Sequence, residues 1–149
     1  MNPKTFFSKA DQLRIENAIV EAEKQTSGEI RLHIQSLTKG DVMDAAVGVF
    51  YRLEMNKTEQ RNGVLFYLSI NDHQFAVIGD SGINKVVPSN FWDSIYEGII
   101  SYFKQNLYAD GLVWAISQAG IQLSSFFPLQ KDDTNELSNE ISFEIKNPD

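Results

Sequence analysis

Asp80 stands in a turn whose residue types fit a site for a hard metal cation. The turn reads Gly79-Asp80-Ser81-Gly82, and its glycines allow main-chain carbonyl oxygens to approach a bound ion closely. Carboxylate and carbonyl oxygens are the ligands that Ca²⁺ and Mg²⁺ require. An aspartate in a turn can instead accept a hydrogen bond from its own backbone, so the motif indicates a candidate ligand and leaves the turn role open.

Three more charged residues are expected at the edge of the sheet that holds Asp80. Glu29 comes just before one strand and Arg61 just before a second, whereas Asp80 follows a third. A right-handed crossover makes the first two strands parallel and a short hairpin reverses the third, so these positions share one edge. Asp93, one turn into the next helix, can overhang it. Glu29 and Asp93 are therefore further candidate metal ligands, and Arg61 is a candidate substrate-binding group.

Glu29 and Asp93 also have ordinary structural interpretations. Glu29 can form a surface salt bridge with Lys24 or Arg61, which would contribute at most about 1 kcal/mol. Asp93 can stabilise the N-terminus of its own helix electrostatically, as acidic residues in a first turn often do. These interpretations stay open beside the ligand roles.

Asp72 and Asp110 are candidate ligands of second rank. Asp72 suits a hairpin turn at the opposite edge, and Asp110, just before Gly111, suits a helix cap. His33 and His73 lack the i, i+4 spacing and the companion ligands of a zinc site, so neither is expected to bind metal.

The spacing of apolar residues predicts four helices. The first begins at a capping box that starts with Ser8 and stops at residues 26–28, and the second begins behind an Asp41 cap. Apolar residues recur at helical spacing in all four segments, which predicts one face buried against a sheet. The expected helical segments are residues 9–25, 42–53, 91–103 and 112–123.

Three strands are expected between these helices. Residues 30–35 alternate apolar and polar side chains, and residues 64–68 are apolar on both faces, as in a central strand covered by helices. Residues 75–78 follow so closely that only an antiparallel hairpin can join them to the central strand. The pattern predicts a three-layer α/β/α sandwich with a small mixed sheet, formed by one domain over about residues 6–128.

Composition limits the classes of partner and location. The 149 residues include no cysteine, which excludes disulfides, thiolate zinc sites and a cysteine nucleophile. A net charge of −7 repels nucleic acid. The N-terminal residues lack a signal-peptide core, and no apolar run is long enough to span a bilayer. We therefore expect a soluble, cytoplasmic protein.

Residues 129–149 form an acidic C-terminal tail. Its composition predicts disorder, because acidic residues greatly outnumber lysines and few apolar side chains are present. Residues 141–145 alternate apolar and polar side chains and offer an alternative, a short edge strand or a docked segment.

Several segments of this chain resemble the TPM domain family, in its short, stand-alone bacterial form. The resemblance covers about residues 6–128 and implies a layered α/β/α fold around a mixed sheet. Members are linked to divalent-cation binding, acid phosphatase activity and the repair of photosynthetic complexes. The matching segments are Thr26-Ser-Gly-Glu-Ile-Arg-Leu-His-Ile34, Arg61-Asn-Gly-Val-Leu-Phe-Tyr-Leu-Ser-Ile-Asn-Asp72, Phe75-Ala-Val-Ile-Gly-Asp-Ser-Gly-Ile83, Phe91-Trp-Asp-Ser-Ile95 and Tyr108-Ala-Asp-Gly-Leu112.

Three functions follow as hypotheses. The first is an accessory or regulatory domain that binds Ca²⁺ or Mg²⁺ through the acidic edge. The second is a metal-dependent acid phosphatase, in which the cation polarises a phosphoryl oxygen and Arg61 steadies the developing charge. The third is a non-catalytic protein-interaction module that uses the aromatic residues Phe91, Trp92 and Tyr96.

Overall fold

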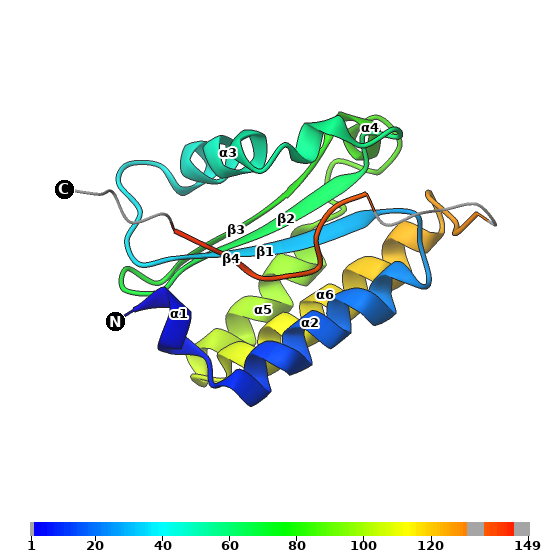
Figure 1. The fold of residues 1–149 in the computed structure, drawn as a ribbon. Helices are drawn as coiled ribbons and strands as arrows, with labels where there is room; N and C mark the ends of the chain where they lie inside the picture. The colour runs from blue at the N-terminus through cyan, green and yellow to red at the C-terminus, as the bar shows by residue number, and fades with distance from the viewer. Residues whose placement is uncertain (1, 131–135, 145–149) are drawn as a thin grey trace.

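A four-stranded mixed sheet forms the middle layer of the computed structural model, which describes residues 2–130 and 136–144 (Figure 1). The strand order is β3-β2-β1-β4. β1 runs parallel to both β2 and β4, and β3 is antiparallel to β2. The predicted α/β fold with a mixed sheet is confirmed. The strands are β1 (Glu29–Gln35), β2 (Gly63–Ser69), β3 (Gln74–Gly79) and β4 (Ser142–Phe143).

Helices cover both faces of the sheet. Three long helices lie on one face, and the longer helix on the other face is α3 (Figure 1). Two predicted caps are confirmed, because the amide of Asp11 donates to Ser8 Oγ at 3.1 Å and that of Asp44 to Asp41 Oδ2 at 3.0 Å. The three long helices are α2 (Lys9–Glu23), α5 (Asp93–Lys104) and α6 (Tyr108–Ser124), and α3 spans Val42–Arg52.

Three short elements were not predicted from the sequence. Each is too short to show a helical period in its apolar residues. Phe91 and Trp92 were expected inside the helix predicted over residues 91–103. They instead precede α5, which begins at Asp93. The short elements are α1 (Pro3–Phe6), a 3₁₀ helix (Met55–Lys57) and α4 (Ser81–Asn84).

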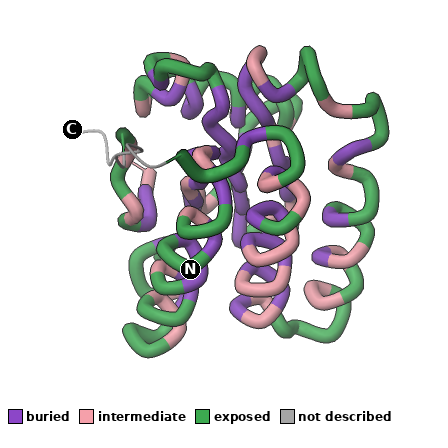
Figure 2. Tube along the Cα trace, turned by 90° about the vertical axis from the view of Figure 1, so that its right-hand side faces the viewer, coloured by how far each residue is buried: buried purple, intermediate pink, exposed green. Residues whose placement is uncertain are grey.

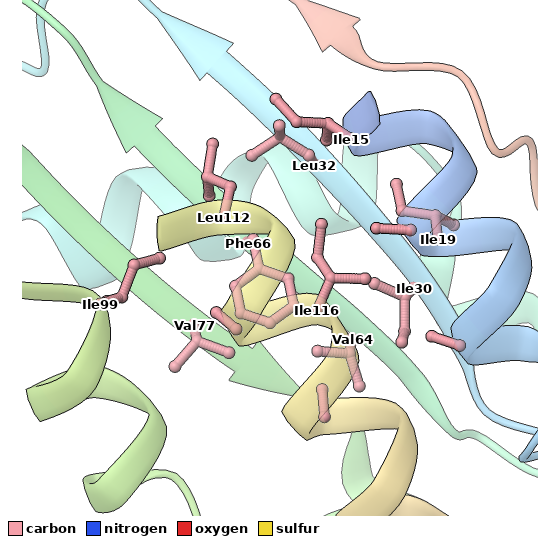
Figure 3. Packing of buried hydrophobic residues seen from close by; sticks show 14 of the residues in the cluster. Ile15, Ile19, Ile30, Leu32, Val64, Phe66, Val77, Ile99, Leu112 and Ile116 are labelled. Atoms are coloured by element: carbon pink, nitrogen blue, oxygen red, sulfur yellow. The ribbon is translucent and has the colours of Figure 1, made fainter. Parts of the chain in front are cut away.

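The main core lies between the sheet and the three long helices. Side chains from β1 and β2 meet those of α2 and α6 there, as with Leu32 and Ile15 or Phe66 and Ile116 (Figure 3). A smaller core lies under α3, where Phe50 packs near Leu65 and Tyr67. Both faces of β2 are therefore covered, and all its residues are buried, as its apolar sequence predicts. Buried residues gather in the interior between the layers, and exposed residues lie on the outside (Figure 2).

The C-terminal segment 136–144 differs from the expected disorder. Its residues Ser142 and Phe143 form β4 beside β1, so the edge-strand alternative is the one observed. Ile141 is buried in the main core. Ser142 Oγ lies 2.9 Å from Nδ1 of the buried His33. The prediction of disorder from composition missed this strand, because a few apolar residues are enough to hold a short segment against the sheet. The other tail residues, 131–135 and 145–149, lie outside the described part of the chain.

Candidate functional site

Glu29, Gly63 and Asp80 lie side by side at one end of the sheet. Glu29 is opposite Gly63 in the parallel pairing of β1 with β2. The main-chain N–H of Asp80 donates to the carbonyl oxygen of Gly63 at 2.9 Å, which continues the row to the end of β3. The shared edge that the strand order predicted for Glu29, Arg61 and Asp80 is confirmed.

The carboxylate of Asp80 is held by Arg61. Arg61 donates from Nε to Oδ2 at 2.8 Å and from Nη2 to Oδ1 at 2.9 Å, and these bonds raise the pKa of the guanidinium. Oδ1 also accepts from the amide of Ser81 at 2.7 Å and so caps α4. Arg61 itself has a left-handed backbone, with φ of 51°. The turn role of Asp80 is therefore realised, and a cation bound at this carboxylate would have to compete with Arg61.

Glu29 pairs with another carboxyl group, that of Glu23 at the end of α2. The two carboxyl groups lie close enough for Glu29 to raise the pKa of Glu23. Each is also fixed by a main-chain amide, since Ile30 N donates to Glu23 Oε2 and Glu136 N donates to Glu29 Oε1, both at 2.9 Å. The two residues suggested as salt-bridge partners of Glu29 pair with other acids: Lys24 pairs with Glu21, and Arg61 pairs with Asp80.

Burial and the neighbouring acid change the protonation of Glu23. Desolvation is the main cause that raises the pKa of Glu23 to about 8, and the charge of the neighbouring Glu29 raises it further, against the lowering effect of the Ile30 amide. Two carboxyl groups in contact in a buried site cannot both ionise easily, so the pair keeps one proton near neutral pH. The sequence interpretation missed Glu23, although the turn at residues 26–28 returns the chain close to it.

Gly63 and Met55 lie between the two acidic positions. Neighbouring strands are about 4.8 Å apart, so two strand spacings put the Cα atoms of Glu29 and Asp80 about 10 Å apart. The 3₁₀ helix packs onto Gly63, where an added Cβ would lie 3.0 Å from the carbonyl oxygen of Met55. Within residues 2–130 and 136–144, no three histidine or acidic residues gather closely enough to hold a metal ion.

The other candidate ligands lie apart from this edge. Asp93 lines a groove beside β3 with Tyr96 and Glu97. Asp110 lies in the first turn of α6 and pairs with Arg14 at 2.6 Å. Its predicted capping role is wrong, because Leu107 occupies the cap position of α6.

Asp72 forms part of the turn between β2 and β3, as its structural interpretation predicted. It accepts hydrogen bonds from Ser69 Oγ, from the amide of Thr38 and from Gln74 Nε2. Partial desolvation opposes the ionised form, but these hydrogen bonds together lower the pKa of Asp72. Its oxygens thus stabilise the hairpin at the end of the sheet opposite Asp80.

His33 is a core residue. It is fully buried and hydrogen-bonds to Ser142 and to Gln35, with 2.8 Å between Nε2 and Gln35 Oε1. Burial lowers the pKa of His33 to about 4, with a smaller opposing effect from the Gln35 hydrogen bond. The ring is therefore neutral at physiological pH and joins β1 to the C-terminal strand.

Comparison with known families identifies the fold. The profile of the TPM domain matches residues 1–122. The chain belongs to the TPM domain family. The resemblance inferred from residues 26–34, 61–72 and 75–83 is thereby confirmed. Comparison with curated proteins gives no match.

Solved structures give the same TPM domain fold. The BA42 protein from the psychrophilic bacterium Bizionia argentinensis is 44% identical, with a TM-score of 0.89 over 93% of this chain and 96% of that one. A P. gingivalis N-terminal domain is 16% identical, with a TM-score of 0.66 over 81% of this chain and 78% of that one. A Corynebacterium glutamicum N-terminal domain is 12% identical, with a TM-score of 0.63 over 97% and 84%, respectively. The last two show likeness of fold alone.

The helices of this TPM domain were also compared with the length of a membrane span. Among those in the described part of the chain, none combines the length and the apolar character needed to cross a bilayer.

Proposed function

We propose that this TPM domain is a non-catalytic accessory or regulatory domain that binds Ca²⁺ or Mg²⁺ at Glu23 and Glu29. The observation that supports this proposal is the close approach of the two carboxyl groups at the start of β1, each of which a main-chain amide fixes at 2.9 Å. A pair of acids in contact needs either a shared proton or a cation between them. Both cations prefer oxygen ligands of this kind.

The surrounding main chain holds the pair in position. The amides of Ile30 and Glu136 each bind one carboxyl oxygen at 2.9 Å, and Glu29 is only 3% exposed. A cation would replace the proton and would complete its shell with water and nearby carbonyl oxygens. Two carboxylates are few for such an ion, so binding in the micromolar to millimolar range is expected.

Competition between proton and cation gives a specific test. Titration of the full chain with CaCl₂ or MgCl₂, followed by amide chemical shifts, should move the signals of residues 23–30 and of Glu136. Because Glu23 has a pKa of about 8, binding should be tighter at pH 8 than at pH 6. Glu23→Gln should weaken it at least about tenfold, since the variant lacks one charged ligand.

Two variants separate this site from other positions. Glu21→Gln lies on the same helix in an exposed pair with Lys24 and should leave binding unchanged. Asp80→Asn should also have little effect, because Arg61 already occupies that carboxylate. If Asp80→Asn abolishes binding and Glu23→Gln does not, the site lies at the Asp80 turn instead. Saturating cation without any shift in either region contradicts both locations.

The phosphatase hypothesis has less support. A phosphoryl group needs free donors, but the guanidinium of Arg61 already donates to both oxygens of Asp80. A phosphomonoester assay of the full chain, with and without Mg²⁺, tests this hypothesis separately from cation binding. Metal-dependent turnover that Arg61→Gln abolishes would favour it.

A further inference from the structure

Two residues of β3 direct main-chain hydrogen-bonding groups away from the sheet. The amide of Asp80 donates to Gly63, and hydrogen-bonded pairs in an antiparallel ladder recur at every second residue. Residues 74, 76 and 78 therefore face β2, whereas the N–H and C=O groups of Phe75 and Val77 face outward. In the described part of the chain, these outward groups have no hydrogen-bond partner.

A groove runs along this edge. Its volume is about 340 Å³. It is lined by Phe75 and Val77 of β3, by Met43 of α3, and by Tyr96 and Glu97 of α5. These two helices lie on opposite faces of the sheet, so the groove opens where a further strand would be added (Figure 1).

The opposite edge of the sheet already accepts an extended segment. There β4 pairs in parallel with β1, and Ile141 beside it is buried in the core. Strand pairing at one edge thus orders a segment that composition predicts to be mobile. At the β3 edge, the described residues supply no such segment.

The walls of the groove specify the chemistry of a partner. Met43 is 44% exposed and Tyr96 is 43% exposed, which leaves apolar surface beside the strand. Asp93 and Glu97 add negative charge, and among the residues that the structure describes no lysine or arginine lines the groove. A second copy of this chain would bring like charges together on a molecule with net charge −7. A partner with basic and apolar side chains fits better.

We propose that the edge of β3 binds an extended segment of another protein, in which apolar residues alternate with lysine or arginine, as an added strand of the sheet. The segment would pair with the outward N–H and C=O groups of Phe75 and Val77. Because successive side chains of a strand point to opposite faces, its apolar side chains would contact Met43 on the α3 side, and its basic side chains would face Tyr96 and Glu97 on the α5 side. This surface is separate from the carboxyl pair at Glu23 and Glu29.

A synthetic peptide tests this mode of binding. A short fluorescein-labelled peptide of alternating valine and lysine should raise fluorescence anisotropy when the full chain is added. In ¹⁵N spectra the amides of Phe75 and Val77 should shift, and their hydrogen exchange should slow, because they gain acceptors. The same peptide with N-methyl groups on alternate residues should bind at least about tenfold more weakly, because methylation removes strand-pairing donors.

Charge reversal provides the matched control. Glu97→Lys should weaken the valine–lysine peptide at least about tenfold and improve binding of a valine–glutamate peptide. Glu21→Lys, an exposed change on α2, should alter neither. The proposal is wrong if the folded chain binds neither peptide, if N-methylation has no effect, or if the shifts map to the outer face of α3 without those of Phe75 and Val77. The last result would indicate a helical partner instead.

Discussion

Arg61 and Asp80 form a two-point ion pair that joins the start of β2 to the end of β3. The guanidinium makes hydrogen bonds of 2.8 and 2.9 Å to the two carboxylate oxygens, and Asp80 is only 5% exposed. Such fork geometry is specific to arginine, because lysine presents a single charged point.

Arg61→Gln should therefore lower the free energy of unfolding, and Arg61→Lys should restore only part of it. Both variants keep a non-glycine residue at φ of 51°, so backbone strain does not explain a difference. Urea denaturation measures the effect. Lys57→Gln breaks an exposed pair with Glu54 and should change stability by less than about 0.5 kcal/mol. Equal losses in Arg61→Gln and Lys57→Gln would contradict a special role for the two-point pair.

Glu23→Gln should stabilise the protein increasingly as pH rises from 5 to 8. The pKa of Glu23 is about 8 in the folded chain against an ordinary value of 4.5. Between these values the unfolded chain has lost the proton that the folded chain still holds. The contribution of protonated Glu23 to the free energy of unfolding is therefore fully present below about pH 4.5 and is lost as pH rises through about 8.

The difference between Glu23→Gln and the parent chain should grow by up to about 1.4 kcal/mol per pH unit in this window. Denaturant unfolding at several pH values, without divalent cations, measures it. Glu21→Gln, with an exposed carboxyl group, should follow the parent chain. A constant difference across the window would show that Glu23 is already ionised when folded.

Gly82→Ala should destabilise the fold by at least about 2 kcal/mol. The added Cβ would lie 2.2 Å from the carbonyl oxygen of Gln60 and 2.6 Å from that of Arg61, and main-chain atoms cannot move aside cheaply. Gly48→Ala is the control, because an added Cβ there meets nothing within 4 Å. This exposed change inside α3 should stabilise by about 0.5–1 kcal/mol. Thermal melts of both variants give the comparison.

Ending the chain at Gln130 should lower stability, contrary to what the composition of the tail suggests. The truncation removes the buried Ile141 and the strand that pairs with β1. Ile141→Ala alone should cost about 2 kcal/mol, whereas Leu129→Ala, 50% exposed, should cost less than about 0.5 kcal/mol. Denaturation midpoints of the three variants measure this. A truncated chain as stable as the full one would show that β4 contributes nothing.

The sequence by itself determined the helices α2, α3, α5 and α6, the first three strands and their common edge. Apolar spacing defines a helix or strand locally, and the short connection between residues 68 and 75 admits only a hairpin. The positions of Glu29, Arg61 and Asp80 at one end of the sheet followed from those local facts and from the handedness of the crossover.

Only the tertiary structure decided which groups at that edge pair with one another. Glu29 lies beside Glu23, whereas Lys24 pairs with Glu21 and Arg61 pairs with Asp80. Residue spacing alone does not predict how close the end of α2 lies to the start of β1. The raised pKa of Glu23 likewise depends on burial by distant parts of the chain. The same holds for β4, whose pairing with β1 joins residues more than a hundred positions apart. Contacts of this kind depend on packing and register, which are properties of the whole fold.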